Sequence, residues 1–236
     1  MPKLAFDIET VGSEWDKLSA PLQESIVRSL KKSTEVEEEY LLKLEEAKVD
    51  LGFSPLTGEI VALGCFDVEK NTGTVFFQSP GKLPTEFSDN GITYKPMEEK
   101  KILESFWELA RGYDEFITFN GYYFDAPYMM LRSAMLSVRP SKNLVEGRYP
   151  YQQKTCKHTD LFDQFSFYGA FKRKGMGLDG LSSAFGVKSP KGEGMDGSQV
   201  GNMFRAGEYE KIARYNAEDI RATAELYRIW EKNLKF

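Results

Sequence analysis

The sequence predicts an α/β domain in which a mixed five-stranded sheet is flanked by helices. Short apolar runs near the start of the chain, separated by a turn, predict an antiparallel β-meander. Further on, apolar runs of strand length alternate with segments of helical periodicity, as in sheets whose strands are linked by helices. Together these runs predict the element order β-β-β-α-β-α-β-α.

The strands follow from short runs of apolar and β-branched residues. The segment LAFDIE near the start of the chain predicts the first strand. The next two are expected at Glu59–Phe66 and Gly73–Gln78, and together with the first they complete the meander. Two later strands are expected at Glu115–Phe119 and His158–Phe162.

The helices follow from apolar positions that recur three and four residues apart. They are expected at Glu98–Ala110, Ala126–Leu136 and Leu178–Phe185, with a last helix or helix pair over Glu208–Leu234. The polar stretch 13–50, which comes directly after the first strand, predicts a helical insertion or arm.

The composition bounds the setting of this domain. The 236 residues are 41% hydrophobic, which is enough for one buried core, so residues 1–236 are expected to form a single domain. No apolar run approaches the length of a transmembrane helix, and the N-terminus lacks the pattern of a signal peptide. The two cysteines, Cys65 and Cys156, are expected to be core thiols of a cytoplasmic protein.

The charge is distributed unevenly along the chain. The formal net charge is −5, but residues 131–191 carry a net charge of +7 and the remainder −12. A basic stretch on an acidic chain is what a local phosphate-binding surface would look like. A solvated basic face is the alternative, and the charge pattern alone leaves it open.

Two acidic residues interrupt the first apolar run. Asp7 and Glu9 share one face of the expected strand, because side chains alternate along a strand, and Leu4, Phe6 and Ile8 share the other. Two carboxylates on one face can reach the same metal ion. A surface strand also alternates apolar and acidic residues, so this pair by itself decides nothing.

A second group of polar and aromatic residues follows a later strand. Asn120, Phe124 and Asp125 come after Glu115–Phe119, and a helix is expected to begin beside them. Asp125 at the helix N-terminus can cap the helix or project into a cleft. The ring of Phe124, next to this carboxylate, is a suitable platform for stacking a nucleobase.

A third pair lies on the last helix. Tyr215 and Asp219 are four residues apart, so both lie on one helical face. Asp219 is a candidate metal ligand, and the Tyr215 hydroxyl is a candidate for orienting a water over the same metal. A surface aspartate near a core tyrosine is the alternative for this segment taken alone.

The four carboxylates together predict a metal centre. Buried charge of one sign is costly unless a partner compensates it. Oxygen ligands with no His or Cys nearby favour Mg²⁺ or Mn²⁺ over zinc. Such a centre suits two-metal phosphodiester hydrolysis. His158, the single histidine of the chain, is expected at a strand end and not in catalysis.

Three motifs carry a resemblance to a known family. FDIET, N-x-x-x-F-D-A-P-Y and Y-x-x-x-D resemble the motifs of the DEDD-type 3′–5′ exonucleases, tyrosine subtype. GLDGLSSAFGV, SPKGEGMDGSQV and YNAEDIRATAELY resemble the stand-alone relatives of the family B DNA polymerase proofreading exonuclease domain. The resemblance implies a ribonuclease H-like fold and a free-standing nuclease. The histidine subtype is excluded, because no histidine lies just before Asp219.

The resemblance also implies the roles of individual residues. Asp7, Glu9, Asp125 and Asp219 match the ligands of two Mg²⁺ or Mn²⁺ ions, and Tyr215 matches the residue that positions the attacking water. Six positions are candidates for substrate contact: Thr10, Asn120, Phe124, Leu178, Lys191 and, second to it, Lys188. Gly177 departs from the pattern, which has Ser or Thr at that position, so a hydroxyl contact is not expected there.

The expected activity is hydrolysis at the 3′ end of DNA, preferably single-stranded, with release of 5′-mononucleotides, as in proofreading or DNA repair. A 3′–5′ exoribonuclease of the same chemistry is one alternative, so RNA stays a possible partner. A catalytically silent module that binds nucleic-acid ends is the other. The complete set of four carboxylates and one tyrosine argues against the silent module.

Overall fold

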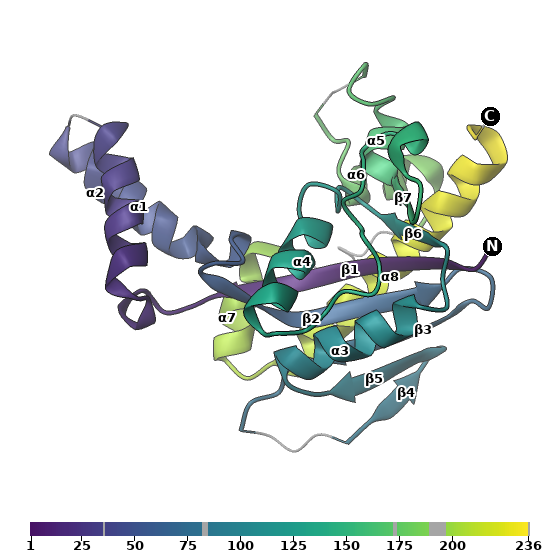
Figure 1. Cartoon of the computed structure of the whole chain (residues 1–236), viewed down its shortest axis with the longest axis horizontal. Helices are drawn as coiled ribbons and strands as arrows, with labels where there is room; N and C mark the ends of the chain where they lie inside the picture. Colours follow the sequence, from purple (N-terminus) through teal and green to yellow (C-terminus); the bar gives the residue numbers. More distant parts are fainter. Residues whose placement is uncertain (35, 82–84, 172–173, 189–196, 236) are drawn as a thin grey trace.

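A seven-stranded mixed sheet with helices on both faces forms the centre of the protein, as seen in a computed structural model (Figure 1). The structure describes residues 1–34, 36–81, 85–171, 174–188 and 197–235. The strands are β1 Lys3–Gly12, β2 Gly58–Asp67, β3 Thr72–Phe77, β4 Phe87–Asp89, β5 Ile92–Pro96, β6 Glu115–Thr118 and β7 Lys157–Asp160. The main helices are α1 Ala20–Lys32, α2 Glu37–Val49, α3 Glu99–Ala110, α4 Asp125–Met135, α5 Leu161–Phe165, α6 Leu178–Phe185, α7 Val200–Arg205 and α8 Tyr209–Asn233.

The strand order in the sheet is β4-β5-β3-β2-β1-β6-β7. The predicted meander is present, since β1 pairs with β2 and β2 pairs with β3, both antiparallel. On the other side of β1, β6 and β7 pair in parallel, so the carboxyl ends of β1, β6 and β7 meet at one edge of the sheet. Asn120, Phe124 and Asp125 follow β6 at this edge.

The prediction of five strands was wrong, because β4 and β5 add to the outer edge of β3. They form a short hairpin around Asn90 and Gly91, both of which adopt left-handed backbone conformations (φ 49° and 78°). An Asn-Gly pair between short strands is a strong hairpin signal. The hydrophobic pattern did not indicate these strands, because β4 has only three residues and the hairpin is largely polar.

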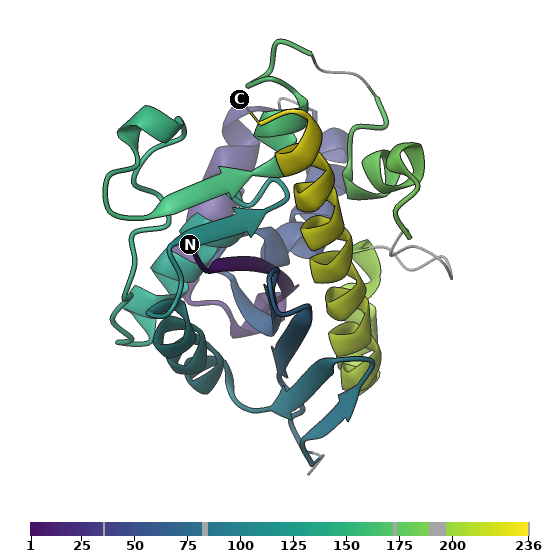
Figure 2. The same cartoon turned by 90° about the vertical axis from the view of Figure 1, so that its right-hand side faces the viewer.

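The two faces of the sheet bury different sets of side chains. Leu4, Phe6 and Ile8 of β1 pack with α3 and α4, whereas Ala5 and Val11 pack with α8. Figure 2 shows α8 running along one side of the strands, with α3 on the other. The alternation predicted for the first strand is therefore confirmed, and Asp7 and Glu9 belong to the face that α8 covers.

The predicted helical insertion is present and projects from the sheet (Figure 1). It comprises a short 3₁₀ turn at Trp15–Lys17, the helices α1 and α2, and a second 3₁₀ turn, η2, at Asp50–Phe53. No described residue of α1 or α2 is buried. The chain returns to the body at η2, where Leu51 is buried beside β1.

The predicted later elements are present with boundaries that differ by at most two residues, whereas the short helices α5 and α7 were not predicted. The strand expected at His158–Phe162 ends at Asp160, because the Asp160 side chain accepts a hydrogen bond from the Phe162 amide and caps α5. Cys65 and Cys156 are free and buried. Among the described helices, none combines the length and the apolar character that crossing a membrane requires.

Candidate active site

The strand β1 presents Asp7 and Glu9 to the face covered by α8. Asp7 pairs with Gly64 and Glu9 pairs with Ala62 on β2, and a bulge follows between Glu9 and Thr10. Bulges occur next to active sites, where they redirect side chains. Here the irregularity comes directly after Glu9, whose side chain is only 7% exposed.

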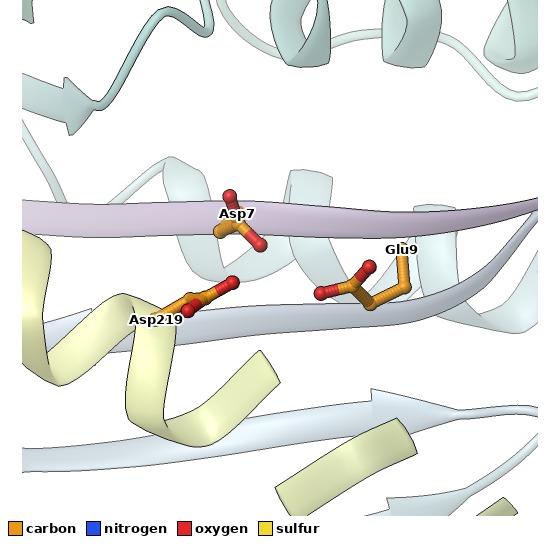
Figure 3. Close-up of side chains that lie close together, drawn as sticks. All are labelled: Asp7, Glu9 and Asp219. Carbon is orange, nitrogen blue, oxygen red and sulfur yellow. The ribbon is translucent and has the colours of Figure 1, made fainter. Parts of the chain in front are cut away.

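The last helix brings a third carboxylate to this pair. Asp219 of α8 is 7% exposed, and one carboxylate oxygen each of Asp7, Glu9 and Asp219 lies within 4.8 Å of the other two. Figure 3 shows the three carboxylates directed toward one another, two from β1 and one from α8. Residues from opposite ends of the chain thus form one acidic group.

A glycine and an asparagine allow α8 to approach the sheet so closely. A Cβ atom on Gly64 would lie 2.3 Å from Oδ1 of Asn216 and 2.8 Å from Cγ2 of Ile220, so only glycine leaves space for the helix. Asn216 is completely buried and donates a hydrogen bond from Nδ2 to Oδ2 of Asp7 at 2.8 Å. The helix that carries Asp219 is therefore tied directly to Asp7.

Asp125 lies beside the group of three carboxylates but makes a different contact. It begins α4 and is buried, and its Oδ1 accepts a hydrogen bond from the Ile8 amide at 2.9 Å. Burial raises the pKa of Asp125 to about 7, while the bond from Ile8 lowers it and the nearby Asp160 raises it. This bond places the Asp125 carboxylate at the backbone of Ile8, the residue between Asp7 and Glu9 on β1.

The charges at the site repel one another. Burial raises the pKa of Asp7 well above its usual range, and the charges of Asp125, Asp219 and Glu9 raise it further. Burial likewise raises the pKa of Glu9, with further contributions from Asp219 and Asp125. Within the described part of the chain, no lysine or arginine forms an ion pair with Asp7 or Glu9. Carboxylate oxygens clustered in this way fit a hard divalent metal ion.

Tyr215 lies one helical turn before Asp219 and is largely buried. Burial raises the pKa of its hydroxyl, and the charges of Asp219, Glu9 and Asp7 raise it further. The phenol therefore stays protonated at neutral pH and can donate a hydrogen bond near the carboxylates. It is not suited to act as a general base.

Three of the predicted substrate contacts surround Asp125 and the end of β1. Thr10 is half-buried and follows the bulge. Asn120 adopts a left-handed conformation with φ 61° after β6. The ring of Phe124 packs edge-to-face against Phe53 of the insertion, with centroids 6.2 Å apart. These residues lie along the edge where the parallel strands end.

The remaining predicted contacts lie later in the chain. Leu178 begins α6 and packs, half-buried, against the core on the α8 side of the sheet. Lys188 is 81% exposed and forms an ion pair with Glu218 at 3.0 Å, so its charge is already engaged outside the group of three carboxylates. Lys191 lies outside the described residues.

Several basic residues of the stretch 131–191 also form ion pairs within the protein. Among the described residues of this stretch, four cations form ion pairs: Arg132 with Glu99, Arg148 with Asp163, Lys157 with Glu115, and Lys188 with Glu218. The partners of the first three are almost completely buried. The positive charge counted along the sequence therefore overstates what a phosphate backbone would meet.

Two residues at the site were not predicted from the sequence. Asn216 stands next to Tyr215, and a polar side chain on the apolar face of a helix was an available signal. Asp160 accepts hydrogen bonds at 2.9 Å from the amides of Asn120, Tyr122 and Phe162. An aspartate directly before a helix is a capping signal, but its reach to the loop after β6 depends on the pairing of β6 with β7.

Comparison with known proteins agrees with this fold. A DNA polymerase of Desulfurococcus sp. (strain Tok) is 26% identical over 211 residues, which cover 75% of this chain and 26% of the polymerase. The family B DNA polymerase from the hyperthermophilic archaeon Pyrobaculum calidifontis superposes with a TM-score of 0.59 at 18% identity, over 98% of this chain and 24% of that one. The chain thus spans about a quarter of the length of these polymerases.

The structural likeness confirms the predicted ribonuclease H-like α/β fold. The profile of one protein family, described as a predicted 3′-5′ exonuclease related to the exonuclease domain of PolB, matches residues 82–232. This match covers more than half of the chain and includes Asp125, Tyr215 and Asp219. The chain therefore belongs to the family of predicted 3′–5′ exonucleases related to the exonuclease domain of PolB.

Proposed function

We propose that this protein is a metal-dependent 3′–5′ exonuclease that hydrolyses the terminal phosphodiester bond of DNA, preferably single-stranded, and releases 5′-mononucleotides. One observation carries the proposal: one carboxylate oxygen each of Asp7, Glu9 and Asp219 lies within 4.8 Å of the other two. The family match supports nuclease chemistry. Residues 1–236 are proposed to act as one exonuclease domain.

The side chains of the site have distinct proposed roles. Asp7, Glu9 and Asp219 would hold divalent cations, with Asp125 beside them as a fourth ligand reached directly or through water. Two Mg²⁺ or Mn²⁺ ions, when bound, would lower the pKa of the attacking water and stabilise the departing 3′-oxygen. Asn216 keeps the Asp7 carboxylate in one orientation through its hydrogen bond at 2.8 Å.

Tyr215 is proposed to orient the attacking water. Its hydroxyl stays protonated, because burial and three nearby carboxylates raise its pKa. A protonated phenol can donate one hydrogen bond and accept another, which suits alignment of a water and not removal of its proton. The proton would leave to solvent or to a carboxylate of the site.

The residues around Asp125 are proposed to bind the terminal nucleotides. Phe124 offers a half-buried ring next to Asp125, and bases stack on aromatic rings with little dependence on sequence. Thr10 and Asn120 lie at the same edge of the sheet and offer polar groups for the sugar and phosphate. As a candidate for substrate contact, Lys188 ranks after these three residues, because it forms an ion pair with Glu218.

The proposal is tested with a single-stranded DNA oligonucleotide labelled at either end. A 3′–5′ exonuclease shortens the 5′-labelled strand in steps and releases a labelled mononucleotide from the 3′-labelled strand at once. Activity should require Mg²⁺ or Mn²⁺ and stop on addition of EDTA. Asp7→Asn and Asp219→Asn should lower turnover by several orders of magnitude while the proteins stay folded. Asp16→Asn, an exposed acid of the insertion, is the matched control.

The same assay separates the alternatives. Faster cleavage of a matched RNA oligonucleotide would favour the exoribonuclease. Tight binding of 3′ ends without metal-dependent cleavage would favour the silent binding module. Full activity in either the Asp7→Asn or the Asp219→Asn protein would contradict the assignment of the site.

A further inference from the structure

A cluster of four tyrosines lies beside the loop that carries Asp125. The cluster consists of Tyr123, Tyr149, Tyr151 and Tyr168, which come from three separate segments of the chain. The rings of Tyr149 and Tyr151 are stacked, with centroids 5.8 Å apart and planes 8° apart, and the ring of Tyr168 lies 5.0 Å from that of Tyr149. Neither the sheet nor the three carboxylates needs these rings.

One arginine organises the tyrosine cluster. The guanidinium of Arg148 lies 5.4 Å from the ring centroid of Tyr123, 5.6 Å from that of Tyr149 and 5.8 Å from that of Tyr168. Two hydrogen bonds to the buried Asp163, at 2.7 and 3.0 Å, hold the guanidinium in place. A bidentate contact of this kind fixes the orientation of the guanidinium as well as pairing its charge. The rings are therefore held in place before any ligand arrives.

The cluster leaves aromatic surface open to solvent. Tyr151 is 78% exposed and Tyr123 is 51% exposed. Because Tyr149 stacks on one face of Tyr151, the exposed area of Tyr151 includes its opposite face. Large exposed rings gathered in one place mark a binding surface more often than rings scattered singly.

The position of the cluster indicates which ligand it would take. Tyr123 is two residues from Asp125, so the two Cα atoms are at most about 7 Å apart. The backbone amides of Asn120 and Tyr122, in the same loop, are held by Asp160. A DNA strand whose 3′ end is bound at the carboxylates must extend out of the site. Its nucleotides further from the 3′ end could pass over this loop.

The charges around the rings are compatible with such a strand. Asp163 is covered by its ion pair with Arg148, and Asp160 is buried and hydrogen-bonded to three amides. Lys154 is exposed and follows Tyr151 by three residues. Exposed rings with a cation three residues away in the chain are a combination that binds single strands without reading their sequence.

We propose that the tyrosine cluster binds the bases of single-stranded DNA upstream of the 3′ end held at the carboxylates. The inference rests on the proposed function, because it takes the 3′ end to lie at Asp7, Glu9 and Asp219. Tyr151, with one open ring face, is the residue that stacks a base. Arg148 is a positioning residue, which acts by holding the rings.

The test measures binding and does not depend on cleavage. An Asp7→Asn protein in EDTA is titrated into fluorescein-labelled oligothymidylates of three and twelve nucleotides, and fluorescence anisotropy gives the dissociation constants. Adding Tyr151→Ala should weaken binding of the 12-mer about tenfold, in line with the loss of one stacked base, and leave the 3-mer within twofold. Tyr151→Trp should restore binding of the 12-mer, since stacking needs a ring and not the hydroxyl.

Tyr40→Ala is the matched control, because Tyr40 on α2 also lies beside a cation, Lys31, but belongs to the insertion. The proposal is overturned if Tyr151→Ala changes binding of the 12-mer by less than twofold, if it weakens both lengths equally, or if Tyr40→Ala causes the same loss. Failure of the proposed function is a separate result: the wild-type protein would not shorten DNA, whatever the length dependence of binding.

Discussion

Asn216 on α8 and Asp7 on β1, 209 residues apart in the chain, are joined by a hydrogen bond of 2.8 Å from Nδ2 to Oδ2. The same amide lies 3.3 Å from the backbone carbonyl of Asp7. The bond fixes the position of the helix along the strand, and with it the position of Asp219 relative to Asp7. It also gives the Asp7 carboxylate one orientation in a site where charge repulsion would otherwise spread the side chains.

Replacing Asn216 with alanine should therefore weaken metal binding. Partners that orient a metal ligand contribute about 10- to 100-fold in metal affinity or activity. We expect Mn²⁺ affinity, measured by titration with detection of free Mn²⁺ by electron paramagnetic resonance, to fall by at least about tenfold. Asn233→Ala, an exposed asparagine on the same helix, should leave the affinity unchanged. Equal affinities for wild type and Asn216→Ala would show that the hydrogen bond does not prepare the site.

Gly64→Ala should perturb the same contact from the side of the sheet. Its Cβ atom would lie 2.3 Å from Oδ1 of Asn216, so α8 must shift or Asn216 must turn away from Asp7. Overpacking of this kind costs about 1–3 kcal/mol in the free energy of unfolding, which a denaturant titration measures. Mn²⁺ affinity should fall as well. At Gly112 the nearest atom to an added Cβ is 3.6 Å away, so Gly112→Ala is the control. A Gly64→Ala protein with wild-type Mn²⁺ affinity would contradict the proposed coupling.

Tyr215→Phe tests whether the hydroxyl only positions a water. The ring keeps its packing, and the hydrogen bond to the water is lost. Turnover of single-stranded DNA should fall by about 10²-fold or less, clearly less than in Asp219→Asn. Mn²⁺ affinity should stay close to that of the wild type. A loss of turnover as large as that of Asp219→Asn would mean that the hydroxyl does more than align the water.

Asp125→Asn should change how stability depends on pH in the absence of divalent cations. Burial raises the pKa of Asp125 from 3.8 to about 7 in the folded protein. Between these two values the folded state binds more protons than the unfolded state, so this group lowers the free energy of unfolding as pH rises from about 4 to about 7. The asparagine does not titrate, and its Oδ1 can still accept the bond from Ile8.

The melting temperature of Asp125→Asn relative to wild type should therefore be higher at pH 8 than at pH 4.5, both measured in EDTA. The comparison cancels groups that titrate independently of Asp125, such as the buried His158, whose pKa burial lowers to about 4. Removing the Asp125 charge also lowers the raised pKa values of Asp7 and Glu9, which changes the difference in the same direction. A difference in melting temperature that is the same at both pH values would show that Asp125 titrates normally in the folded protein.

The parts of the site that the sequence predicts are those encoded by local patterns. Alternation along the first strand places Asp7 and Glu9 on one face of that strand. Helical spacing places Tyr215 and Asp219 on one face of the last helix. The contact between Asn216 and Asp7 needs the absence of a side chain at Gly64 on a third element, which no local pattern shows. The hairpin of β4 and β5 was missed for a related reason: strands this short are stabilised by pairing with β3 and not by their own apolar pattern.

The loop between β6 and α4 should depend on Asp160 in the same non-local way. Oδ1 of Asp160 accepts hydrogen bonds from the amides of Asn120 and Phe162, and Oδ2 accepts one from Tyr122, each at 2.9 Å. Asp160→Asn can keep the Oδ1 contacts and the cap of α5, but it places an amide NH₂ against the Tyr122 N–H. The loop that carries Phe124 should therefore loosen while the helix stays capped.

We expect hydrogen exchange of the Tyr122 amide to accelerate in Asp160→Asn, and the KM for single-stranded DNA to rise by a larger factor than kcat falls. The reason is that Asn120 and Phe124 are proposed to bind the strand, whereas the carboxylates on β1 and α8 do not depend on this loop. Mn²⁺ affinity serves as the internal control and should change little. If kcat falls and KM is unchanged, Asp160 acts on the metal site through Asp125, and the loop is not what it positions.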